Sequence, residues 1–164
     1  MEKLLNKAIT EINGYKDEII DKLVEFSKTD LILFWDRKTD LYLLQEKEWR
    51  PILTWVEKEL NVELKISNNL DVPENVGLQE ALRKILFNMS DKELVCCYAA
   101  ALNMRSVLLA LAFVNRKLKA EDVWKLSYLE ELWQNNLWGV DEEANAKRLE
   151  RSRELKDIES YLLK

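Results

Sequence analysis

Apolar residues recur every three or four positions along most of this chain, which is the spacing of amphipathic helices. In the first segment Leu5, Ile9 and Ile12 share one face, and Gly14 is suited to end the helix. The same spacing predicts further helices near residues 19–26, 41–48, 51–60 and 78–87, with Pro51 in the first turn of its helix.

A capping box marks the start of the most apolar segment. Glu93 follows Ser90 by three residues, and this pair predicts the beginning of a long helix over about 91–115. That helix is apolar nearly all round between Val107 and Val114, which indicates a position at the centre of a helical bundle. A further helix is predicted over 120–137, ending at Gly139. A last helix follows, with Asp141 as its cap and with alternating charges that predict an exposed, salt-bridged face: Glu150, Arg151, Arg153 and Glu154.

Two stretches depart from this helical pattern. The run from Leu31 to Trp35 is apolar throughout, and periodicity alone leaves a helical turn and a short strand open for it. Asparagines and Val72-Pro73 mark turns between 61 and 75. With only three glycines and two prolines in 164 residues, the chain lacks the turns of a sandwich or barrel. We therefore predict a mainly α fold, a compact multi-helix array in one domain over 1–164, with one irregular insert near 61–76 and little or no sheet.

The composition argues against most enzyme classes. The chain has no histidine, which removes histidine bases, triads and metal ligands. Cys96 and Cys97 are adjacent and have apolar neighbours, so we expect buried free thiols in a reducing compartment rather than a metal site. Neighbouring carboxylates such as Glu130 and Glu131 diverge by about 100° along a helix, which does not suit paired acid–base catalysis. We expect no catalytic residue, no cofactor and no metal.

Charge and hydropathy bound the partners. The net charge is −5, and no block of five like charges occurs, which gives little support to a nucleic-acid partner. Arg105 interrupts the longest uncharged stretch before it reaches the roughly 20 residues of a membrane span. The first residues have neither a signal-peptide core nor a transit-peptide pattern. We therefore expect a cytoplasmic protein, or one of the mitochondrial matrix in a eukaryote, without membrane insertion.

One face of the segment 120–138 carries an unusual mixture of residues. Treated as a single helix, it places five side chains within an arc of about 80°: Trp124, Ser127, Glu131, Gln134 and Trp138. Polar groups flanked by tryptophan are typical of a protein-binding patch. A buried carboxylate and amide held by internal hydrogen bonds would give the same pattern. A groove lined by Trp49, Pro51 and Trp55 is a second candidate, with core packing as the alternative for these residues.

Several motifs, in their order and spacing, resemble one family. They are Ser27-x-Thr29-Asp30, Leu43-x-Gln45-x-x-x-Trp49-x-Pro51-Ile52-x-x-Trp55, and the closing signature Ser127-x-Leu129-Glu130-Glu131-x-Trp133-Gln134-x-x-x-Trp138-Gly139. Together they resemble the chaperones that assemble the F1 part of ATP synthase by attending its alpha subunit. The resemblance covers essentially residues 1–160.

The resemblance implies a chaperone without enzymatic activity. Such a protein would bind the unassembled alpha subunit and keep it from aggregating until the beta subunit takes its place. In the family, the acidic residue that matches Glu131 is the position most associated with function, and Trp49 matches a sensitive tryptophan. We therefore predict that the client is bound by Glu131, Gln134, Trp124, Trp138, Ser127, Glu130 and Trp49. A helical scaffold or adaptor with an unrelated partner is the alternative.

The chain departs from the family pattern at its beginning. Family members carry a strand-rich amino-terminal domain before the helical part, and this chain begins where the helical part begins. A natural short form, a split pair with a separately encoded amino-terminal domain, or a shortened chain would each account for this.

Overall fold

The structure, a computed structural model, describes residues 1–37 and 39–164, and these residues are mainly helical. The α-helices in chain order are α1 (Glu2–Glu11), α2 (Lys16–Phe26), α3 (Thr39–Leu60), α4 (Leu78–Phe87), α5 (Asp91–Met104), α6 (Val107–Val114), α7 (Ala120–Ser127), α8 (Leu129–Trp138) and α9 (Glu142–Leu162). Short 3-10 turns add η1 (Ile12–Gly14), η2 (Ser27–Thr29) and η3 (Leu31–Leu33). The described part of the chain forms no sheet, and the predicted mainly α fold is confirmed.

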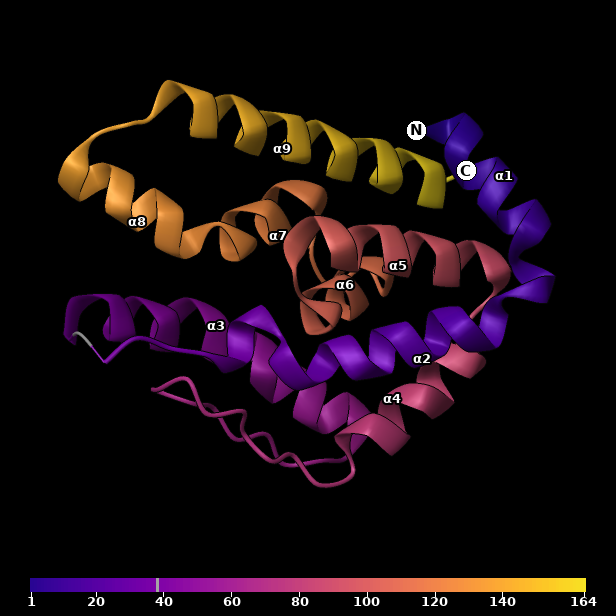
Figure 1. Cartoon of the computed structure of the whole chain (residues 1–164), viewed down its shortest axis with the longest axis horizontal. Helices are drawn as coiled ribbons and strands as arrows, with labels where there is room; N and C mark the ends of the chain where they lie inside the picture. Colours follow the sequence, from indigo (N-terminus) through magenta and orange to yellow (C-terminus); the bar gives the residue numbers. More distant parts are fainter. Residues whose placement is uncertain (38) are drawn as a thin grey trace.

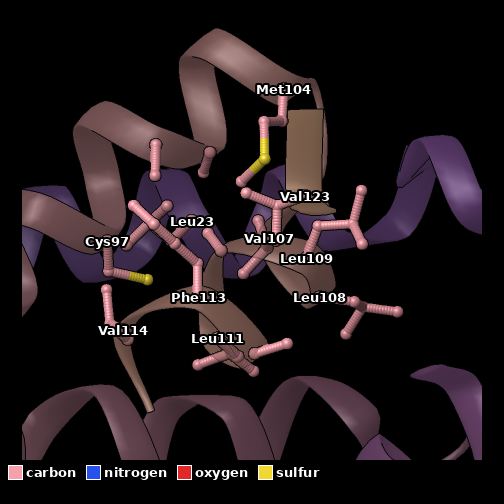
Figure 2. Packing of buried hydrophobic residues seen from close by; sticks show 14 of the residues in the cluster. Leu23, Cys97, Met104, Val107, Leu108, Leu109, Leu111, Phe113, Val114 and Val123 are labelled. Carbon is pink, nitrogen blue, oxygen red and sulfur yellow. The ribbon is translucent and has the colours of Figure 1, made fainter. Parts of the chain in front are cut away.

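Helix α6 lies at the centre of the molecule. All eight of its residues are buried, and it packs against α3, α5 and α7. In Figure 1, α9 lies on one side of the group formed by α5, α6 and α7, and α2, α3 and α4 lie on the other. Figure 2 shows side chains of α6 meeting Leu23 from α2, Cys97 and Met104 from α5, and Val123 from α7. The prediction that the segment 107–114 forms the centre is confirmed.

The apolar run 31–35 combines the two conformations that its pattern left open. Its first three residues form η3, and the chain then extends so that Phe34 pairs with Ser67 in an isolated parallel bridge. Between α3 and α4 no regular element forms, which agrees with the predicted irregular insert. The bridge fixes this insert to the rest of the fold, because the Trp35 amide donates to the Ser67 carbonyl at 2.8 Å and the Ser67 amide donates to the Leu33 carbonyl at 2.8 Å.

The prediction of one continuous helix over 91–115 is wrong, because the structure has two helices there. The capping box of Ser90 and Glu93 starts α5 as expected, but α5 ends at Met104 and Arg105 takes a left-handed conformation with φ of 60°. Ser106 then caps α6 by accepting from the Leu109 amide at 3.0 Å. The chain therefore reverses between two short helices, because the left-handed residue and a new N-cap interrupt the backbone ladder.

Two other helix boundaries also differ from the prediction. The helix expected over 120–137 breaks at Tyr128 into α7 and α8. The Ser127 hydroxyl donates to the Trp124 carbonyl at 3.0 Å just before the break, which competes with the regular helix ladder. In contrast, the helices expected at 41–48 and 51–60 form one helix, α3, with Pro51 inside it. Pro51 is exposed, and the buried residues on either side of it, among them Trp49 and Leu53, hold the helix in the core.

A buried carboxylate joins the segment before η3 to the beginning of α6. Asp30 accepts from the Ser106 hydroxyl at 2.6 Å, from the Leu108 amide at 3.0 Å and from the Ile32 amide at 3.2 Å. Asp30 is fully buried, and burial raises its pKa to about 6, although the three hydrogen bonds oppose that shift. The Asp30 carboxyl therefore accepts from the first turns of both η3 and α6. Its ionised form is disfavoured by the loss of contact with water.

The raised pKa predicts an unusual pH dependence of stability. The folded state holds the Asp30 proton more tightly than the unfolded state, whose pKa is near 3.8, so this contribution is fully present below about pH 4 and is lost as the pH rises through about 6. We expect the free energy of unfolding of the wild type, relative to Asp30→Asn, to fall by up to about 3 kcal/mol between those limits. Urea unfolding of both proteins across this pH range measures the difference. A difference that stays constant would show that the hydrogen bonds cancel the effect of burial.

Candidate protein-binding surface at helices α7 to α9

The three helices α7, α8 and α9 hold most of the residues that the sequence singles out. Trp124 on α7 fixes α9 in place, because its indole N–H donates to the Arg148 carbonyl at 2.9 Å. Trp124 is half-buried and packs against the core. The predicted capping of α9 by Asp141 is confirmed, since its carboxylate accepts from the amides of Glu143 and Ala144. The position of α9 beside α7 is therefore set by specific hydrogen bonds as well as by apolar packing.

Trp49 lies inside the molecule. Only 1% of its surface is exposed, and its indole N–H donates to the Leu126 carbonyl at 2.9 Å, which joins α3 to α7. Ser127 is also buried, next to the break between α7 and α8. Of the two roles that the sequence left open for Trp49, the structure places it in the core beneath the surface.

Helix α8 is the least covered helix of the described chain. None of its ten residues is buried. Glu130 and Gln134 are exposed, and Trp138 at the end of the helix is 84% exposed. The exposed side chains of Leu137 and Val140 lie next to Trp138 in the chain. This end of α8 therefore presents an apolar surface to the solvent, which we call the α8 edge and define as Leu137, Trp138 and Val140.

Glu131 faces the first half of α9. One of its carboxylate oxygens lies 3.8 Å from Nη1 of Arg148, which is only 5% exposed, whereas the Glu131 side chain is 42% exposed. At that separation the two groups attract each other without a hydrogen bond. The same Glu131 oxygen is buried, as are Nε and Nη2 of Arg148, and none of the three has a hydrogen-bond partner among the residues that the structure describes. Of the exposed and the buried positions that the sequence left open for Glu131, the structure shows an intermediate one, with a side chain that is 42% exposed and one carboxylate oxygen that is buried.

A hollow of about 420 Å³ lies beside this ion pair. It is bounded by residues from the start of α8, from α9 and from the junction of α5 and α6: Arg105, Tyr128, Glu131, Ala144, Lys147, Arg148, Glu150 and Arg151. We call it the basic hollow, because four of these residues are cationic and two are anionic. Arg105 lies above the Tyr128 ring, with its guanidinium carbon 5.8 Å from the ring centre. Arg151 is paired with Glu154 at 3.2 Å.

The sequence pattern identified residues on only one side of this hollow. The stripe from Trp124 to Trp138 assumed one helix, and the break at Tyr128 leaves only Glu131, Gln134 and Trp138 together on α8. The cations come from α9 and from Arg105, and the charges of α9 were assigned to an exposed face. The left-handed Arg105 directly precedes Ser106, the N-cap of α6, so a serine before an apolar run is the sequence signal that could have located the junction.

The described residues contain no group of three or more histidine, cysteine or acidic side chains placed to hold a metal ion. Cys96 and Cys97 are buried free thiols, as predicted, and burial raises the pKa of the Cys96 thiol to about 11. Among the helices described, none has both the length and the apolar character needed to span a membrane.

The all-α fold of this chain is similar to about two thirds of the solved Atp12 structures. Atp12 from Paracoccus denitrificans superposes with a TM-score of 0.89 and 25% sequence identity, over 96% of this chain and 68% of that one. A point mutant of the same Atp12 gives the same values. The Atu1473 protein of Agrobacterium tumefaciens gives a TM-score of 0.83 and 25% identity, over 96% of this chain and 61% of that one.

The sequence agrees with the fold. Residues 1–57 match the family described as ATP12 chaperone protein. The matched segment ends within α3, and the structural similarity extends over the helices that follow. The chain thus resembles the ATP12 chaperone family both in its first third and in its overall fold, and the predicted family resemblance is confirmed.

Proposed function

We propose that this chain is an assembly chaperone that binds the unassembled alpha subunit of the F1 part of ATP synthase. It would cover apolar surface that the alpha subunit otherwise buries against the beta subunit, and would release it when the beta subunit arrives. It acts by binding alone, without catalysis, in the cytoplasm of a bacterium or in the mitochondrial matrix. Besides the family resemblance, one observation carries the proposal: no residue of α8 is fully buried, and its last three residues are exposed.

The α8 edge supplies the apolar part of this contact. A tryptophan that is 84% exposed, with two exposed aliphatic neighbours, is uncommon on a protein without a partner. Tryptophan is also the residue type that most often dominates binding energy at protein interfaces. Gln134 and Glu130 are exposed on the same helix and would supply polar contacts around the apolar centre. Glu131 would face the client with the exposed part of its carboxylate.

The test uses purified alpha subunit, which is kept unfolded and then diluted into buffer. We expect the chain to suppress its aggregation, as followed by light scattering, and to be recovered with it by affinity capture. The chain is also used to capture proteins from a lysate of the organism that encodes it. If it neither suppresses aggregation nor retains the alpha subunit, and instead captures a different protein from that lysate, the alternative function of a helical scaffold or adaptor would be favoured.

Trp138→Ala is expected to weaken capture of the alpha subunit by about tenfold to a hundredfold, because it removes the largest exposed apolar group of the α8 edge. Its free energy of unfolding should change by less than about 0.5 kcal/mol, since the side chain is almost fully in solvent. The matched control is Leu4→Ala on α1, which is also exposed but lies at the opposite end of the molecule from α8 (Figure 1). Equal capture by Trp138→Ala and Leu4→Ala would contradict the assignment of this edge.

A further inference from the structure

The basic hollow carries more positive charge than its own chain neutralises. Its lining has four cations and two carboxylates. Among the described residues, neither Arg105 nor Lys147 has a carboxylate within ion-pair distance, whereas Arg151 is paired with Glu154. The lining alone has two more cations than carboxylates, and a surplus of one positive charge remains when Glu154 is counted against Arg151, on a chain whose net charge is −5.

Arg148 is the most unusual of these cations. Only 5% of its surface is exposed, yet Nε and Nη2 have no hydrogen-bond partner within the described part of the chain, and the Glu131 carboxylate lies 3.8 Å from Nη1. Leaving buried donors unpaired costs free energy, more so for a charged group. Nε and Nη2 form one edge of the guanidinium, which is the edge that binds a carboxylate through two parallel hydrogen bonds. The Arg148 side chain is therefore buried without an acceptor, among the described residues, for Nε or Nη2.

We propose that the basic hollow binds a carboxylate side chain of the protein client, with Arg148 as its principal ligand. Nε and Nη2 are closed to solvent in the free chain, so the guanidinium turns toward the hollow that it already lines when the client arrives. Lys147 and Arg105 add positive charge at the rim, because both are exposed there. Glu131 holds Arg148 weakly in the free state and yields it to the incoming carboxylate.

An acidic segment of a protein suits this site better than a small anion alone. The hollow lies on the same group of helices as the α8 edge, so a client could place an acidic residue in the hollow and an apolar one against Trp138. The identity of that client depends on the function proposed above. The chemistry of the hollow does not, and it can therefore be tested separately.

The test titrates the full, isotope-labelled chain with an acetylated triglutamate amide and follows the Nε–H signal of Arg148 by NMR. The signal is assigned by its absence in Arg148→Met. We expect a saturable shift with the acidic peptide and none with an acetylated trilysine amide at the same ionic strength. Absence of a saturable shift would overturn the proposal. An equal response to inorganic phosphate would also overturn it, since the hollow would then be a general anion site.

Two pairs of variants sharpen the result. Lys147→Ala should lower the affinity for the peptide by roughly three- to tenfold. Lys156 is exposed on α9 but lies outside the hollow, so Lys156→Ala should change that affinity by less than about twofold. Glu131→Gln should strengthen binding of the peptide by roughly threefold or more, because it removes the one carboxylate that, among the described residues, lies within ion-pair distance of Arg148 Nη1. The Glu131→Gln result still decides the question if Arg148→Met does not fold. Identical affinity in Lys147→Ala and the wild type would count against the rim cations.

The proposal and the assigned client can fail separately. If the wild-type chain does not retain the alpha subunit but its Arg148 signal responds to the acidic peptide, the assignment of the alpha subunit as the client is wrong, and the binding of a carboxylate in the hollow is supported. If the chain retains the alpha subunit and folded Arg148→Met retains it equally well, the hollow is wrong and the client stands.

Discussion

Trp49→Ala is expected to lower the free energy of unfolding by about 3–5 kcal/mol, which is a large part of the stability of a chain of this size. The tryptophan is 1% exposed, and it is among the largest fully buried side chains of the described core. Its removal would leave a cavity between α3 and α7 and would leave the Leu126 carbonyl without the indole donor at 2.9 Å. Urea unfolding, followed by far-UV circular dichroism, measures the loss.

The control for this substitution is another tryptophan. Trp138→Ala removes the same side chain from a solvent-exposed position, so it separates the effect of burial from the effect of losing an indole. Trp49→Phe should recover part of the stability, because it restores apolar volume without the hydrogen bond. If Trp49→Ala were as stable as Trp138→Ala, the position of α3 against α7 in this structure would be incorrect.

Glu131→Lys is expected to reduce both capture of the alpha subunit and stability. The new ammonium group would lie beside Arg148, which is already buried and only weakly neutralised. Stability should fall by about 1–3 kcal/mol, less than for a fully buried ion pair because Glu131 itself is 42% exposed. Capture of the alpha subunit should weaken by about tenfold to a thousandfold, because the proposed contact of the exposed part of the Glu131 carboxylate with the client is lost, and this loss opposes the added attraction of the new cation for an acidic residue in the basic hollow. The urea midpoint of the free variant and its capture of the alpha subunit, measured at a temperature where it stays folded, form the decisive pair.

The charge-reversal control must lie away from the hollow. Glu150 on α9 belongs to the lining of the basic hollow, so it is unsuitable although its helix shows the pattern of an exposed face. Glu63, exposed in the insert between α3 and α4, offers the same change in net charge at a remote position. A folded Glu131→Lys protein that retains the alpha subunit as well as Glu63→Lys does would remove Glu131 from the proposed contact.

The sequence is sufficient to predict the helices and the centre of the core, because burial of apolar residues follows a local period. Val107 to Val114 were apolar all round, and their burial follows from that alone. The breaks at Arg105 and Tyr128 were not predicted, since periodicity counts apolar positions and does not detect a backbone that changes direction. At Arg105 the decisive features are a left-handed residue and a serine cap, which act over only two or three positions.

The candidate site was harder to predict than the fold, because its parts come from distant segments. Arg148 looks like one more charge of a polar helix, and only the docking of α9 against α7, through the Trp124 indole, buries it beside Glu131. Trp49 and Ser127 stood out as large or polar groups in a motif, but a motif does not tell whether its residues form the surface or support it. The exposed half of the site, Glu130, Gln134 and Trp138, follows the sequence pattern more closely.

The carboxylate of Asp30 has a consequence for the order in which a growing chain can fold. It bonds to Ser106 and Leu108, which lie 76 and 78 positions further along the chain, so the central helix receives its cap from a segment synthesised much earlier. On the ribosome, the apolar faces of the amino-terminal helices stay exposed to solvent until α5 and α6 have emerged. At about 5–20 residues per second, synthesis of the 76 positions between Asp30 and Ser106 takes several seconds, which is far longer than the formation of a single helix. The contacts of Asp30 with α6 can therefore form only after about two thirds of the chain has been made.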